Sequence, residues 1–257
     1  MGDFQDFMTR KIYRRNRMSK NRVLSTVFVL VVAGISFFVI LNVADFISST
    51  LMNKSSIFYG GNVRSNGYVM YGMCFYQVSG KTEAEVLSES IKNQGGAGYI
   101  QQQGDYFVYA SMYASFADAN SVKEKLGGSA NVVNISVPAI NFKFGGSADE
   151  IVSALGAFKK IYEALYKVSL DYDQGIIDTA GAKGAIKSCI ELAQPDLNKI
   201  LSIKDDNVKL VISTLTKTLD HLKLLSGRQY WGLEFNAAIK YAYFEAVFNN
   251  IALAKSL

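Results

Sequence analysis

The chain has 257 residues, of which 49% are hydrophobic and 19% charged, and its formal net charge is +5. Residues 1–22 hold seven cations and two anions, so this short segment carries the whole positive surplus, and the rest of the chain is charge-balanced. The balance argues against nucleic-acid binding, which needs a basic folded surface. The only two cysteines, Cys74 and Cys189, exclude a disulfide framework; two buried, unpaired thiols are expected, and a single bridge between them is the alternative.

Residues 23–44 form an uninterrupted segment without a charged side chain. As a helix this segment is about 33 Å long, enough to cross a hydrocarbon core of about 30 Å. We predict a transmembrane helix. The basic tail 1–22 then stays in the cytoplasm, in contact with anionic lipid, and the remainder lies across the membrane. A cleaved signal peptide is the alternative, although its apolar region is usually only about 7–15 residues long.

Residues 45–68 are rich in serine, asparagine and glycine and predict a stalk linker. Its maximum extension is about 80 Å, which keeps the following segments near the membrane. Pro138 marks a change of pattern, so two outer domains are predicted, a strand-rich one at 69–137 and a helical one at 147–257.

The strand-rich segment shows two similar halves. Each half predicts a strand, a capped helix and a second strand, and the caps at Thr82 and Ser115 are 33 residues apart. The predicted strands cover residues 69–78, 97–103, 105–112 and 131–137, with a hairpin at Gly104. The resulting βαββαβ order predicts a ferredoxin-like α+β domain, with two helices on one sheet face and the other face open.

Two short motifs carry a resemblance to a known family. Tyr76–Ser79 and Tyr106–Tyr113 are similar to the two half-repeats of the SPOR (sporulation-related repeat) domain, a bacterial peptidoglycan-binding module. Ser79 stands where that family often has glycine, and Ser111-Met112 replaces a Gly-Pro pair. The resemblance covers residues 69–137 and implies that the open sheet face binds glycan strands.

Strand alternation then selects the candidate site residues. Matching Gln77 to an exposed glutamine of that family places every second residue of each strand on the open face. The glycan-binding candidates are Phe75, Gln77, Ser79, Phe107 and Tyr109. Two alternatives stay open: a register error of one residue would turn these side chains inward, or the aromatic face packs against the carboxy-terminal segment instead.

The carboxy-terminal segment shows four apolar stripes at helical spacing, typical of an antiparallel helical bundle. The stripes cover residues 151–168, 176–194, 208–225 and 231–253, and the second is predicted to end before Pro195. His221 is the only histidine and is expected to be solvated beside Asp220 on a charged stretch, so neither a metal site nor a histidine-based triad is expected. No phosphate-binding glycine loop is present, and no cofactor is predicted.

The sequence therefore predicts a single-pass bacterial cell-membrane protein that is not an enzyme. Its expected role is to bind peptidoglycan glycan strands outside the cytoplasm, in cell division, sporulation or wall remodelling. The helical bundle is expected to recruit a wall or divisome protein. The alternative is a protein–protein assembly module of a membrane complex that binds no sugar.

Overall fold

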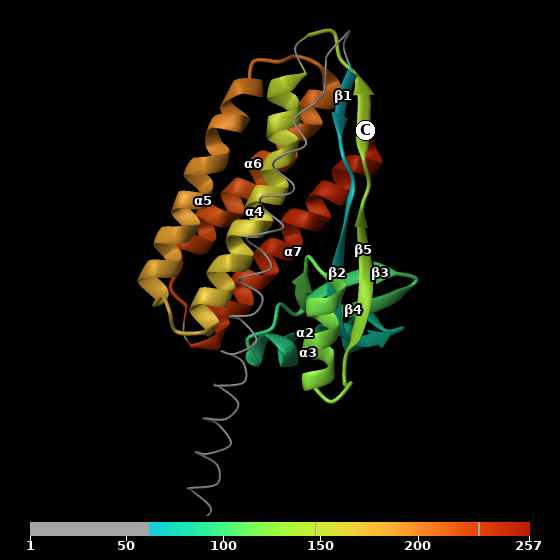
Figure 1. The fold of residues 1–257 in the computed structure, drawn as a ribbon, viewed down its shortest axis with the longest axis vertical. Coiled ribbons are helices and arrows are strands. Elements are labelled where there is room, and N and C mark those ends of the chain that lie inside the picture. The colour runs from blue at the N-terminus through green and yellow to red at the C-terminus, as the bar shows by residue number, and fades with distance from the viewer. Residues whose placement is uncertain (1–61, 147, 231) are drawn as a thin grey trace, which may run out of the picture. The chain divides into compact units, whose positions relative to one another are not determined.

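The computed structural model describes residues 62–146, 148–230 and 232–257, and these residues form one compact unit (Figure 1). The predicted tail 1–22 and transmembrane helix 23–44 lie outside the described residues. Strands and short helices come first along the described chain, and four long helices follow. Among the described residues, no helix combines the length and apolar character that a bilayer span requires.

A four-stranded antiparallel sheet forms the strand-rich part, in the order β3-β4-β2-β5. Its strands are β2 (Tyr68–Val78), β3 (Tyr99–Gln103), β4 (Asp105–Tyr113) and β5 (Asn131–Val137). The eleven-residue strand β2 is an inner strand, so it pairs with β4 along one edge, from Tyr71 to Val78, and with β5 along the other, from Tyr68 to Cys74.

Helices α2 (Lys81–Asn93) and α3 (Phe116–Lys125) cover one face of this sheet. Ala84 and Ile91 of α2 form a buried cluster with Val108 of β4, while Ala119 of α3 packs with Met73 of β2. These apolar contacts fix the face that points toward the helices.

One predicted helix start is confirmed and another is wrong. The Ser115 hydroxyl accepts a hydrogen bond from the backbone N–H of Asp118 and caps α3, as predicted. Helix α2 instead begins at Lys81 after Gly80, without a side-chain cap, so Thr82 lies inside the helix. The sequence also predicts a capping box at residues 147–150, before the first long helix, and its capping residue Ser147 lies outside the described residues.

A second, two-stranded sheet pairs β1 (Asn62–Ser65) with β6 (Ile140–Lys143). Val63, Ile140 and Phe142 alternate with exposed residues along these strands and are buried. This alternation is what a half-buried strand requires. The end of the predicted stalk and the predicted linker after Pro138 are therefore ordered strands.

The predicted fold class requires a correction. The chain is α+β, but its order is ββαββαββ followed by four helices, and not the predicted ferredoxin-like βαββαβ unit. The extra strands arise because buried apolar residues extend the pairing beyond both predicted ends. The second face of the main sheet is also not left open, because the last helix contacts it.

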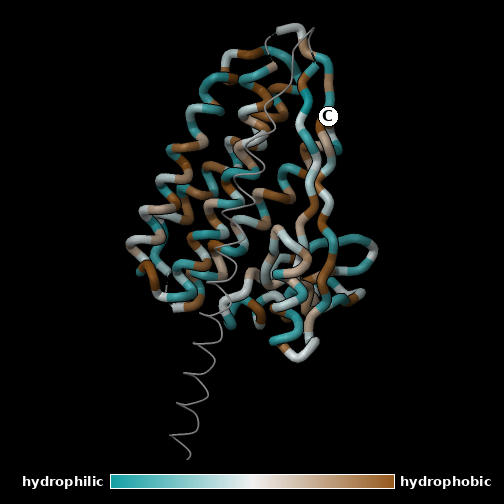
Figure 2. The backbone as a smooth tube through the Cα atoms, in the orientation of Figure 1, coloured by the Kyte–Doolittle hydropathy of each residue, from teal (hydrophilic) through white to brown (hydrophobic). Residues whose placement is uncertain are grey.

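The four long helices are α4 (Asp149–Asp173), α5 (Thr179–Ile200), α6 (Asp206–Gly227) and α7 (Leu233–Ser256). Helix α4 contacts both α5 and α7, and α6 contacts α5 and α7. Hydrophobic residues recur along each helix between hydrophilic ones (Figure 2), and α4, α5 and α6 each bury one apolar stripe.

The predicted end of the second long helix before Pro195 is wrong. Helix α5 continues through Pro195 to Ile200. Proline usually interrupts a helix because it lacks an N–H donor. Here Pro195 is exposed, while Ala193, Leu197 and Ile200 on the same segment are buried, so packing holds the last turns in place.

Helix α7 joins the helical and strand-rich parts. It contacts α4 and α6 on one side and β4, β5 and α2 on the other (Figure 1). Tyr99 of β3 lies against two of its aromatic rings, with centroid distances of 5.2 Å to Phe244 and 4.9 Å to Phe248. Because α7 is buried on both sides, twelve of its side chains belong to the core.

Candidate functional site

The five predicted glycan-binding residues fall into three environments. Phe75 packs in the clusters beneath α2 and α3, so it does not lie on the face opposite these helices. Tyr109 lies on that opposite face but is only 1% exposed. Gln77 and Ser79 are exposed and Phe107 is half-buried, so these three residues remain accessible.

The position of Phe75 follows from an irregularity in β2. The pairing of β2 with β4 shifts between Met73 and Cys74 and again between Cys74 and Tyr76. A bulge of this kind inserts an extra residue and reverses the alternation of side chains beyond it. Phe75 and Val78 consequently both pack toward α2, and Phe75 and Gln77 do not share a face.

Tyr109 is covered by helix α7. Its ring centroid lies 5.6 Å from that of Phe244, and its neighbour across the pair, Tyr99, stacks on the same helix. Burial raises the pKa of the Tyr109 hydroxyl well above its usual value. Tyr109 is therefore part of the core between sheet and helix, and no ligand can reach it without displacing α7.

An accessible row of side chains lies just beyond the covered region. Gln101, Phe107 and Gln77 stand directly opposite one another on β3, β4 and β2, and we name these three residues the amide row. Their neighbours Ile100, Val108 and Val78 pack toward α2, which places the amide row on the other face. The row spans two strand spacings, about 10 Å.

The amide row offers hydrogen-bonding groups on both sides of an aromatic ring. Gln77 Nε2 donates to Asp105 Oδ2 at 2.7 Å, which orients the Gln77 amide. Gln101 Oε1 is buried and has no hydrogen-bond partner among the described residues. An acceptor in this state loses solvation without compensation unless a ligand or water donates to it.

Sequence reasoning missed Gln101 and Asp105, although a local signal was present. The hairpin turns at Gly104, whose backbone has a positive φ of 75°. Pairing is symmetric about this glycine, so Gln103 faces Asp105 and Gln101 faces Phe107. Counting outward from Gly104 therefore identifies both residues as neighbours of the predicted site.

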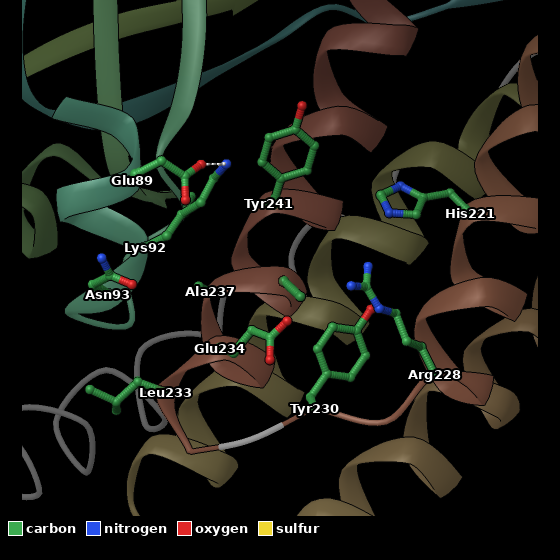
Figure 3. Close-up of a pocket in the computed structure, with 12 residues that line it drawn as sticks. Glu89, Lys92, Asn93, His221, Arg228, Tyr230, Leu233, Glu234, Ala237 and Tyr241 are labelled. Atoms are coloured by element: carbon green, nitrogen blue, oxygen red, sulfur yellow. Dashed lines mark hydrogen bonds and ion pairs between the residues drawn. The ribbon is translucent and has the colours of Figure 1, made fainter. Parts of the chain in front are cut away.

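A pocket of about 740 Å³ lies elsewhere on the same unit, between α2, α6 and α7 (Figure 3). Lys92 Nζ, at one wall, lies 2.8 Å from Glu89 Oε1 and 5.8 Å from the centroid of the Tyr241 ring. Arg228, at the opposite wall, places its guanidinium 5.5 Å from the centroid of Tyr230. Burial raises the pKa values of both tyrosines.

His221 also lines this pocket, which corrects the prediction of a solvated histidine next to Asp220. Its Nδ1 contacts Glu245 Oε2 from α7. The hydrogen bond from His221 lowers the pKa of Glu245, with further help from the charges of His221 and Lys217 against the effect of burial. Asp220 instead pairs with Lys223.

Two further site predictions concern cysteines and metals. Cys74 and Cys189 are both buried and unpaired, which confirms the prediction of two idle thiols. Burial raises the pKa of Cys189 to about 11, so this thiol stays protonated at neutral pH. Within residues 62–146, 148–230 and 232–257, no three acidic, histidine or cysteine side chains gather as metal ligands would.

Comparison of the chain with protein-family models, with curated proteins and with solved structures finds no match. The resemblance to the SPOR domain therefore depends on the two half-repeat motifs alone.

Proposed function

We propose that the protein is a membrane-tethered glycan-binding protein that contacts peptidoglycan strands outside the cytoplasm through the amide row. The observation that carries this proposal is the alignment of Gln101, Phe107 and Gln77 on three adjacent strands, on a part of the sheet that α7 leaves accessible. Ser79 lies next to the row and is exposed.

The chemistry of the row suits a sugar. A sugar ring has an apolar C–H face, which packs well on an aromatic side chain such as Phe107. Its hydroxyl and acetamido groups need donors and acceptors at the ring edge, and the two glutamine amides supply both. A ligand hydroxyl or N–H that donates to Gln101 Oε1 would satisfy an acceptor that has no partner among the described residues.

The proposed role is binding and not catalysis. The anchor would hold the binding face near the wall, and the helical segment would recruit a wall or divisome protein. In an incubation of the full-length protein with isolated peptidoglycan, we expect no release of soluble muropeptides above a buffer control. A time-dependent release would contradict a purely binding role.

Co-sedimentation of the full-length protein, in detergent micelles, with isolated peptidoglycan tests the site. We expect Gln101→Ala and Phe107→Ala each to weaken binding about three- to tenfold, the effect of losing one hydrogen bond or one ring contact. Gln102→Ala is the matched control, because Gln102 is exposed on the same strand but points to the other face. Equal effects of all three variants, or no sedimentation of the unmodified protein, would reject the proposal.

A second candidate function is a protein-assembly module that binds no sugar. The observation in its favour is that the aromatic half of the sheet face already binds a helix, α7, through Tyr99 and Tyr109. A partner helix could extend this mode over Phe107. The absence of glycan binding, together with capture of a helical partner that Phe107→Ala abolishes, would favour this candidate over the first.

A further inference from the structure

The pocket between α2, α6 and α7 has the size and the walls of a small-ligand site. Its volume of about 740 Å³ lies within the range of about 300–1,000 Å³ that is usual for such sites. Ala97, Leu233 and Ala237 supply apolar wall, and the polar groups come from three separate helical segments. The pocket is distinct from the amide row, which lies on the sheet.

Arg228 is the cation of this pocket that is open to a ligand anion, because its side chain is exposed. Its guanidinium lies 5.5 Å from the centroid of the Tyr230 ring and, among the described residues, makes no ion pair or side-chain hydrogen bond. The other cation, Lys92, is already paired with Glu89. A guanidinium held by an aromatic ring presents its fork of donors to a carboxylate or phosphate.

The remaining groups around Arg228 suit a hydroxylated ring. Tyr230 and Tyr241 flank the space, and Figure 3 shows His221 and Arg228 along the same side of it. Glu245 contacts only Nδ1 of His221, so the other imidazole nitrogen is available to a hydroxyl group. Asn93 adds an amide at the opposite wall. Aromatic side chains together with polar groups that donate and accept hydrogen bonds are what a sugar needs.

We propose that this pocket binds an anionic sugar, a hydroxylated ring that carries one carboxylate or one phosphate, with the anion on Arg228 and the ring in the space that Tyr230 and Tyr241 border. Glu234 also lines the pocket, and its negative charge opposes the bound anion. Removing the charge of Arg228 should therefore weaken the binding of the anionic sugar, and removing the charge of Glu234 should strengthen it.

Calorimetric titration of the full-length protein in detergent tests the proposal with three probes. Glucuronate and glucose 6-phosphate carry the two anionic groups, and glucose is the neutral analogue. We expect at least one acidic sugar to bind about tenfold or more tightly than glucose, as a charge-assisted contact implies. The stronger of the two identifies the anionic group.

Two variants and one control complete the test. Arg228→Gln should remove the preference for the acidic sugar over glucose. Glu234→Gln should strengthen the binding of the acidic sugar, and a folding defect cannot cause such an increase. Lys209→Gln is the control, because it removes one exposed positive charge at the far end of α6. Binding of all three sugars alike, binding of none, or an Arg228→Gln protein that retains the preference would overturn the proposal.

The outcome is separable from that of the peptidoglycan experiment. Arg228→Gln should leave co-sedimentation with peptidoglycan unchanged, and Phe107→Ala should leave the titration with the acidic sugar unchanged. If Arg228→Gln reduced both, the pocket would be part of the peptidoglycan site and the inference of a separate site would be wrong.

Discussion

Asn236 is a buried amide that joins two polar side chains, Ser169 and Asp173, at the junction of the helices and the strand-rich part. It is 1% exposed, accepts a hydrogen bond from Ser169 Oγ at 3.1 Å, and donates to Asp173 Oδ1. One turn further along α7, Lys240 Nζ lies 2.9 Å from both Asp173 Oδ2 and the carbonyl oxygen of Gly95. The network therefore ties α4, α7 and the end of α2 together.

We expect Asn236→Ala to lower the free energy of unfolding by about 1–3 kcal/mol, because it leaves the buried Ser169 hydroxyl without its acceptor. Urea denaturation followed by circular dichroism measures this change. Asn198→Ala is the control, since Asn198 is exposed on α5 and its hydrogen bond to Gln194 is a surface contact. A loss of equal size in both variants would show that burial of the network is not the cause.

Asp196 is a second buried polar residue, and its charge makes stability depend on pH. Burial raises the pKa of its carboxyl, but hydrogen bonds from Ser153 and Lys160, at 2.8 Å and 3.1 Å, outweigh this effect and hold the pKa below its usual value of 3.8. The ionised form is therefore bound more strongly in the folded state than in the unfolded state.

Asp196→Asn should lower the free energy of unfolding by about 1–2 kcal/mol at pH 7, since Lys160 is largely exposed and its charge is screened. A carboxyl whose pKa is lower in the folded state than in the unfolded state stabilises the folded protein at pH values above the unfolded-state pKa. The difference between wild type and variant should thus persist down to about pH 4 and shrink below it. Urea titrations between pH 3 and 7 measure it, with the exposed Asp220→Asn as the control. A difference that grows as the pH falls would contradict this account.

At the scale of elements, β4 was predictable from sequence and β2 was not. Alternation along β4 correctly assigned Tyr106, Val108 and Ala110 to the helix-covered face, where they pack with α2. In β2 the same rule misplaced Phe75, because the bulge next to Cys74 reverses the alternation. A bulge depends on the register with the partner strand, and alternation within one strand carries no information about it.

The burial of Tyr109 could not be predicted from the sequence of β4, for a different reason. The aromatic run of α7 was recognised as an apolar stripe, but a stripe does not identify its partner. Phe244 and Phe248 lie more than 130 residues from Tyr99 and Tyr109 in the chain and still contact them. Packing of the aromatic face on the carboxy-terminal segment was one of the two open alternatives, and the structure selects it for this half of the face.

At the scale of the whole molecule, α7 makes the strand-rich and helical parts depend on each other. Phe244 is fully buried and touches Tyr99 and Tyr109 of the sheet as well as Tyr243 of its own helix. The described residues accordingly form one compact unit. Such an arrangement predicts a single cooperative unfolding transition for both parts.

We expect Phe244→Ala to lower the free energy of unfolding by about 3–5 kcal/mol, the usual cost of removing a buried phenylalanine ring. If the two parts unfold together, native-state hydrogen exchange should show the same loss of protection in β4 and in α5, although only β4 contacts Phe244. Phe116→Ala is the matched control, because this ring is 54% exposed on α3 and should change protection in neither element. Lost protection in β4 with unchanged protection in α5 would instead show that the helices fold independently of the sheet, and the amide row would then be carried by a separate domain.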